Sequence, residues 1–175
     1  MKLMLRILGG LAALVVGLVA IAYLLPRHYH VERSVVVQVP AAALFPRLVD
    51  LREWKTWTVW HERDPQMKNS YSPEQGVVGA WSSWESKTEG NGKATLTAFE
   101  ADRHVVYRLE FPDANLVSTG TFALSAEGAG TRVVWSDEGD LGFNPLNRWF
   151  GLFLDKLVGA DFDAGLAKLK RIAEK

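Results

Sequence analysis

The chain has 175 residues, with 20 basic and 20 acidic side chains and no cysteine. The lack of cysteine excludes disulfides, thiolate metal sites and a cysteine nucleophile. Only Lys2 and Arg6 carry charge before residue 26, so the remainder has a formal charge of −2 (18 basic minus 20 acidic). A domain of this charge has no electrostatic basis for binding nucleic acid, and none is expected as a partner.

Residues 1–26 are predicted to form an N-terminal transmembrane anchor. The run Ile7–Leu25 has no charged residue, and at about 1.5 Å per residue it gives a helix of roughly 28 Å, close to the ~30 Å hydrocarbon core. Ala20-Ile21-Ala22 also has the small-x-small form of a signal-peptide cleavage site, which is the alternative. The apolar run is longer than a usual signal peptide has, so an uncleaved anchor is favoured.

The anchor predicts a single-pass protein of the cell membrane with its domain on the extracytoplasmic side, although the flanking basic residues separate the two orientations weakly. Gly9, Ala13 and Gly17 are spaced four apart. A small-xxx-small face of this kind lets two membrane helices approach closely. Ordinary glycine and alanine content is the favoured explanation, and a weak homodimer through the anchor is the alternative.

Residues 27–175 are predicted to form one α+β domain. Pro40 begins two short helices over Ala41–Trp57, interrupted by Pro46, whose ring disfavours a helix interior. Trp54 and Trp57 are interpreted as packing residues of these helices. Alternation and turn signals predict seven short strands, as in an antiparallel meander. They cover His30–Pro40, Met67–Tyr71, Gly79–Lys87, Lys93–Glu100, His104–Phe111, Asn115–Ala126 and Thr131–Glu138.

The last predicted element is a long helix over Pro145–Ala173. Asn144 supplies an N-cap and Pro145 suits the first helical position. Apolar residues recur along the whole helix and form a broad stripe, which is expected to cover the sheet. The stripe comprises Leu146, Trp149, Phe150, Phe153, Leu157, Phe162, Leu166, Leu169 and Ile172.

Several motifs of the domain resemble the SRPBCC superfamily, which includes START-like, Bet v 1-like and polyketide cyclase/dehydrase-type proteins. The likeness extends over about Val31–Glu174. It rests on Trp54-Lys55-Thr56-Trp57, Trp60, Asp64-Pro65, Gly79, Trp84-Glu85-Ser86, Gly90-Asn91-Gly92, Thr131-Arg132-Val133-Val134-Trp135, Gly159, Phe162, Gly165-Leu166 and Leu169-Lys170. The resemblance implies a helix-grip (Bet v 1-like) fold, in which a curved antiparallel sheet wraps around the C-terminal helix and encloses a deep apolar cavity. It implies no particular chemistry, because this fold hosts many functions.

Alternation along the strands places sets of candidate residues on one face each. If those faces are concave, they line the cavity together with the helix, and Asp137 adds a carboxyl group at its rim. The candidate ligand-binding residues are Trp84, Tyr107, Leu109, Phe111, Trp135, Asp137, Phe150, Phe153 and Leu157. For the aromatic residues, the competing interpretation is that they are simply core.

These observations favour a membrane-anchored, non-catalytic domain that binds a small hydrophobic ligand, either a lipid or a polyketide-like compound. No catalytic residue, metal site or cofactor is predicted. The first alternative is a cyclase- or dehydrase-like enzyme acting on an aromatic or polyketide substrate, for which Asp137, Glu85, Tyr107 and Arg108 are the polar candidates. The second alternative is an envelope protein-interaction module, which an exposed apolar patch would favour.

Overall fold

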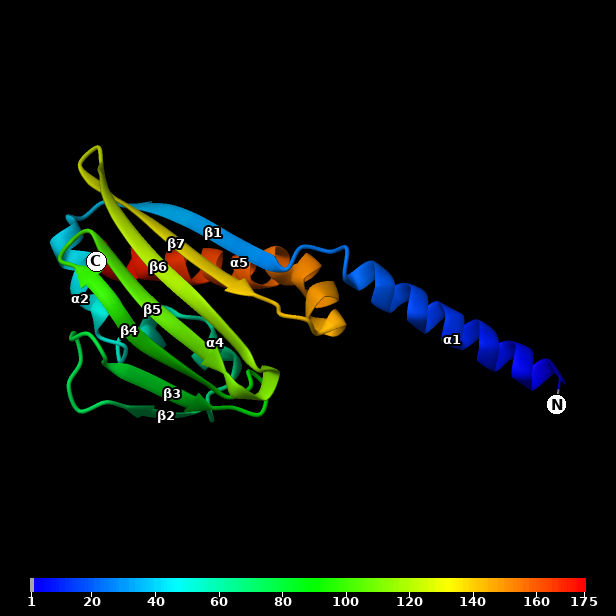
Figure 1. The fold of residues 1–175 in the computed structure, drawn as a ribbon. Coiled ribbons are helices and arrows are strands. Elements are labelled where there is room, and N and C mark those ends of the chain that lie inside the picture. The colour runs from blue at the N-terminus through cyan, green and yellow to red at the C-terminus, as the bar shows by residue number, and fades with distance from the viewer. Residues whose placement is uncertain (1) are drawn as a thin grey trace.

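A computed structural model describes residues 2–175 as a curled sheet with helices against one face, preceded by a helix that projects away from it (Figure 1). That N-terminal helix is α1 (Lys2–Ala22). All of its side chains except that of Ala22 are exposed, and the mean hydropathy of its 18-residue window is 2.3. By length and composition, α1 is a candidate membrane span.

The order of elements after α1 follows the predicted order closely. The strands are β1 (His28–Val37), β2 (Lys68–Tyr71), β3 (Trp81–Glu85), β4 (Gly92–Glu100), β5 (His104–Phe111), β6 (Leu116–Glu127) and β7 (Gly130–Asp140). The helices are α2 (Ala41–Val49), α3 (Trp54–Trp57), α4 (Trp60–Arg63) and α5 (Pro145–Ala173), with a 3-10 turn η1 (Pro112–Ala114) before β6. Pro46 lies inside α2 rather than between two helices. At the sixth position of a nine-residue helix, it removes only one intrahelical hydrogen bond.

The seven strands form one antiparallel sheet in the order β1-β7-β6-β5-β4-β3-β2. β1 crosses over to pair with β7, while the other strands follow one another as a meander. Figure 1 shows α5 running beneath the sheet, along β1 and β7, and the short helices lying on the same side. This arrangement confirms the predicted helix-grip fold.

Aromatic rings fill the space between the middle of the sheet and the second half of α5. The indole of Trp135 on β7 stacks on Phe162 of α5, with centroids 3.9 Å apart and planes 8° from parallel. Trp57 of α3 also contacts Trp135, edge-to-face, with ring centroids 5.3 Å apart. The packing role predicted for Trp54 and Trp57 agrees with their exposures of 9% and 0%. The central aromatic cluster comprises Trp54, Trp57, Tyr107, Phe122, Trp135 and Phe162.

Glycine lies directly opposite an aromatic residue at three places on the face that α5 covers. The cross-strand pairs are Trp84 with Gly92, Tyr107 with Gly120, and Tyr29 with Gly139. A Cβ atom added to these glycines would lie 2.2, 2.0 and 2.7 Å from the nearest atom of the respective ring. Because each glycine has no side chain, the opposite aromatic ring packs directly over the backbone of the strand that carries the glycine.

The two halves of α5 have different surroundings. In the second half, Phe162, Leu166 and Leu169 are buried against the sheet. In the first half, Leu154 is buried, but the large apolar residues on another face of the helix are exposed. The prediction that one apolar stripe covers the sheet along the whole helix is therefore wrong for residues 145–157. The two apolar sets follow different helix faces, and only one of them turns toward the sheet.

Candidate functional site

The concave face of the sheet carries a buried polar cluster near the end at which α1 joins the domain. Asp137 on β7 is 5% exposed. It accepts a hydrogen bond from the Tyr29 hydroxyl on β1, at 2.7 Å, and another from the Ser118 hydroxyl on β6, at 3.0 Å. The three residues come from adjacent strands, and we call them the Asp137 cluster. Its position near the start of β1 follows from the pairing of Tyr29 with Gly139.

Burial gives the Asp137 carboxyl group unusual acid–base properties. Its pKa is raised from 3.8 to about 6, because desolvation disfavours the charged form. The hydrogen bonds from Tyr29 and Ser118 oppose this shift but do not cancel it. The same burial, with the nearby Asp137 charge, raises the pKa of Tyr29, so its hydroxyl remains protonated. The cluster therefore contains a carboxyl group that changes protonation near neutral pH, beside a permanent hydroxyl donor.

Apolar side chains extend from this cluster across the same face of the sheet, toward β5 and β3. Leu109 pairs across the strands with Ser118, and Phe111 pairs with Leu116. These apolar residues are only partly buried, and the Phe111 ring contacts Trp84 at 5.9 Å. Alternation thus correctly placed Trp84, Leu109 and Phe111 on the face shared with Asp137. Partly covered apolar groups next to a few hydrogen-bonding groups are typical of small-molecule sites.

Two of the predicted site residues lie deeper, in the aromatic core. Tyr107 and Trp135 are each 1% exposed. The Trp135 indole N–H donates to the Tyr107 hydroxyl oxygen at 2.7 Å, so each satisfies the other in the interior. Both residues also contact Phe122. They share the concave face with Asp137, but they form the packed floor behind the cluster.

The three predicted site residues of α5 lie on the surface instead. Phe150, Phe153 and Leu157 are 51%, 56% and 52% exposed. The structure therefore does not bring them into the packed interior with Tyr107 and Trp135. Glu85 and Arg108, candidates for the enzyme alternative, are also exposed, and Arg108 pairs with Glu110 at 3.2 Å. Of the four polar candidates, Asp137 and Tyr107 are buried on the concave face.

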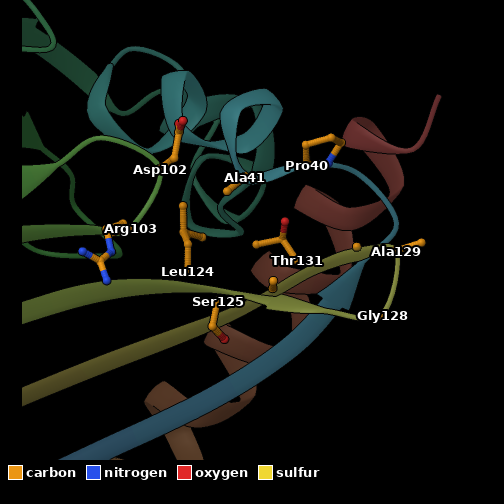
Figure 2. A pocket seen from close by; sticks show the side chains of 11 residues that line it. Pro40, Ala41, Asp102, Arg103, Leu124, Ser125, Gly128, Ala129 and Thr131 are labelled. Atoms are coloured by element: carbon orange, nitrogen blue, oxygen red, sulfur yellow. The ribbon is translucent and has the colours of Figure 1, made fainter.

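Open hollows lie at both ends of the sheet, and neither is lined by a residue of α5. The first, of about 610 Å³, lies between the start of α2, the turn before β5 and the β6–β7 turn (Figure 2). Its lining includes Pro40, Arg103 and Thr131. Thr131 is six residues from Asp137 along β7, or about 20 Å. The second, of about 450 Å³, is lined partly by Tyr29 and Ser118, the two partners of Asp137. Its other lining residues include Val117, Thr119 and Glu138, whose side chains alternate to the outer face of the sheet, so this hollow lies behind the cluster and not over it.

Tyr29 and Ser118 were not predicted from the sequence. Both lie on strands that alternation identifies, but their contact with Asp137 depends on the pairing of β1 and β6 with β7. Alternation assigns a residue to a face without giving this cross-strand register.

Within residues 2–175, no group of three or more His, Asp or Glu side chains is placed to hold a metal ion.

Comparison with solved structures supports the fold. The chain is similar to the di-domain ARO/CYC protein StfQ from the steffimycin biosynthetic pathway (15% identity, TM-score 0.62), covering 84% of this chain and 51% of StfQ. It is also similar to DynU16, a protein in the dynemicin biosynthetic locus (14% identity, TM-score 0.59), covering 83% of this chain and 47% of DynU16. A solution structure from Thermobifida fusca matches at 20% identity and TM-score 0.63, covering 82% of this chain and 92% of that one.

This chain thus spans about half the length of StfQ and of DynU16. At these identities, the likeness establishes the fold alone. No curated protein matches the chain. The family model described as "Polyketide cyclase / dehydrase and lipid transport" matches residues 28–174, which include every strand of the sheet and α5. The chain therefore belongs to the polyketide cyclase/dehydrase and lipid transport family, a part of the SRPBCC superfamily.

Proposed function

We propose that this protein is anchored in a membrane by α1 and binds a small hydrophobic molecule at the α1-proximal end of its concave face. The observation that carries the proposal is the Asp137 cluster, a buried polar group flanked by partly covered Leu109, Phe111 and Trp84. In such a site, the apolar residues bind the body of the ligand and the cluster hydrogen-bonds its polar group. Below its pKa of about 6 Asp137 can donate a hydrogen bond, and above it the carboxylate accepts one.

Membership of a lipid transport and cyclase family supports a hydrophobic ligand. The packed interior also limits where the ligand can bind. The central aromatic cluster fills the middle of the domain, so the ligand occupies the end of the sheet beyond Tyr107 and Trp135. A lipid acyl chain or a compact ring system fits this placement better than a molecule enclosed along the whole length of α5.

The test is native mass spectrometry of the full chain, released from membranes of its own host, with organic extraction of the same sample. A reproducible non-protein mass that is recovered in the extract supports binding. A protein that carries no added mass from several independent preparations, and whose tryptophan fluorescence does not respond to a panel of lipids and aromatic compounds, would overturn the proposal.

An enzyme of the cyclase/dehydrase type is the second candidate, because Asp137 has a pKa near neutrality in a partly apolar site. The two candidates differ in what happens to a bound molecule. An enzyme would return the extracted compound with water lost or with rings closed, and replacing Asp137 with Asn would stop that change. A binding protein would return the compound unchanged, whether residue 137 is Asp or Asn. Incubation of the extract with wild type and D137N, followed by mass spectrometry, distinguishes these outcomes.

A further inference from the structure

The first half of α5 presents a continuous apolar surface that nothing else in the domain covers. Leu146, Phe150, Phe153 and Leu157 follow at intervals of four, three and four residues, so they lie along one face of the helix. Their exposures are 75%, 51%, 56% and 52%. Phe143, just before the helix, is 69% exposed. We call these five residues the α5 stripe. An exposed apolar surface of this extent marks a contact with another apolar phase or molecule.

The backbone that carries the α5 stripe is firmly held. Beside the stripe, Leu154 is 5% exposed, and Gly151 lies so close to Leu141 that an added Cβ would come within 2.4 Å of its side chain. Asn144 caps the helix by accepting a hydrogen bond from the Leu146 amide at 3.0 Å. The exposed side chains therefore belong to an ordered helix, and their exposure does not result from fraying.

Charge along α5 changes abruptly at the end of the stripe. Between residues 143 and 158, the charged side chains are Arg148, Asp155 and Lys156, and none belongs to the stripe. Arg148 is buried, and Asp155 pairs with Arg33 of β1 at 2.9 Å. From residue 159 to the C-terminus, the chain has seven charged residues in 17. An amphipathic segment with a free apolar face and little charge on that face is suited to the interfacial layer of a bilayer.

The start of α5 contacts the end of α1, the candidate membrane span. The Trp149 indole N–H donates to the carbonyl oxygen of Leu18 at 3.2 Å, and Arg148 donates to the carbonyl oxygens of Tyr23 and Leu25 at 3.3 and 3.2 Å. Leu18 is within the uncharged run that ends at Leu25. It precedes the last residue of α1, Ala22, by four residues, or about 6 Å along the helix axis. Figure 1 shows the start of α5 beside the end of α1.

If α1 spans the bilayer, Trp149 is thus about 6 Å inside the point where the spanning helix ends, a depth at which indole rings and amphipathic helices are usually found. We infer that residues 143–157 are an interfacial membrane-binding segment, with the α5 stripe inserted among the outer acyl chains of the lipid leaflet. This inference rests on the membrane anchoring in the proposed function. It deepens that function, because the Asp137 cluster lies at the same α1-proximal end of the domain as this segment, which gives a hydrophobic ligand a short path from the bilayer.

The chain has no cysteine, so a single cysteine can be introduced and labelled with a nitrobenzoxadiazole dye. Position 153 tests the stripe through F153C, and L146C provides a second site in case the first variant folds poorly. A164C is the matched control, because Ala164 is also exposed. It lies eleven residues after Phe153, which places it on nearly the same helix face but about 16 Å farther from α1. L11C reports whether α1 is inserted. Each full-length variant is reconstituted in phosphatidylcholine vesicles with and without headgroup spin-labelled lipid.

The expected result is a blue-shifted emission at positions 146 and 153 that loses most of its intensity when spin-labelled lipid is present, with position 164 water-like and unquenched. If position 11 is lipid-exposed while 146 and 153 behave as 164 does, anchoring stands and the interfacial segment is overturned. A blue shift at 146 and 153 without lipid quenching means that protein covers the stripe, such as a second copy of this chain, and also overturns the inference. If neither position 11 nor the stripe contacts lipid, both the anchor and the interfacial segment are overturned.

Discussion

The substitution D137N should change how the stability of the domain depends on pH. Asp137 is buried, and within residues 2–175 its side chain hydrogen-bonds only to the hydroxyl groups of Tyr29 and Ser118 and forms no ion pair. Asn has nearly the same shape and keeps an oxygen that can accept from Tyr29, while its amide group can donate to the Ser118 hydroxyl. The substitution therefore removes the titration of residue 137 and leaves its packing almost unchanged.

The magnitude follows from the two pKa values. The carboxyl group titrates at 3.8 in the unfolded chain and at about 6 in the folded protein, a difference equivalent to about 3 kcal/mol of folding free energy. Because the folded-state pKa is the higher one, this contribution is fully present below about pH 4, declines as the pH rises through about 6, and is lost above about pH 7. Wild type should therefore lose up to about 3 kcal/mol relative to D137N between these limits.

The assay is urea unfolding of the full chain in detergent micelles, followed by tryptophan fluorescence, for both proteins at several pH values. The difference between the two free energies of unfolding is the relevant quantity, because other carboxyl groups shift in the opposite direction. Asp140, for example, has its pKa lowered to about 2 by Arg27. A difference between wild type and D137N that stays constant from pH 4 to pH 8 would refute the argument that Asp137 is buried without a compensating charge.

Three further substitutions test the packing and the junction with α1. G120A should destabilise the domain by about 1–3 kcal/mol, because its new Cβ would overlap the buried Tyr107 ring. S125A, at an exposed position on the same strand, is the control. Equal urea unfolding midpoints for G120A and S125A would contradict the prediction. Y107F should cost about 1–3 kcal/mol by leaving the Trp135 indole N–H without its acceptor, whereas Y71F, on the partly exposed edge strand, should have little effect on thermal unfolding. R148M should increase amide hydrogen exchange across residues 23–28, because the carbonyl groups of Tyr23 and Leu25 lose their donor; unchanged exchange there would mean that these bonds do not hold α1 against α5.

Much of the fold could be predicted from local sequence signals, because each of them acts over a few residues. Asn144 and Pro145 correctly marked the start of α5, and the Asn144 side chain does cap it. The predicted strands Gly79–Lys87 and Lys93–Glu100 correspond to β3 and β4. Alternation placed Asp137 and Phe111 on the concave face, since side-chain direction in a strand depends only on parity.

The candidate site could be predicted only in part, because it depends on contacts between distant segments. The apolar spacing along α5 does not indicate which residues meet the sheet. Phe162 stacks on Trp135, whereas Phe153, of the same residue type on the same helix, is exposed. Tyr29 reaches Asp137 only because β1 crosses over to pair with β7 and Gly139 leaves room for its ring. Such information comes from tertiary pairing, which a single sequence does not contain.

Ligand binding at the α1-proximal end of the concave face is tested most directly by blocking that end alone. Leu116 and Val117 are neighbours on β6; Leu116 is partly buried on the concave face, and Val117 is exposed on the other face. L116W is designed to block the site with a larger side chain, and V117W is the matched control on the other face. Full-length wild type, L116W and V117W are purified from the same host membranes and compared by native mass spectrometry. We predict an added non-protein mass on wild type and V117W that is lost from L116W. An added mass that persists in L116W, or its absence from all three proteins, would contradict binding at this site.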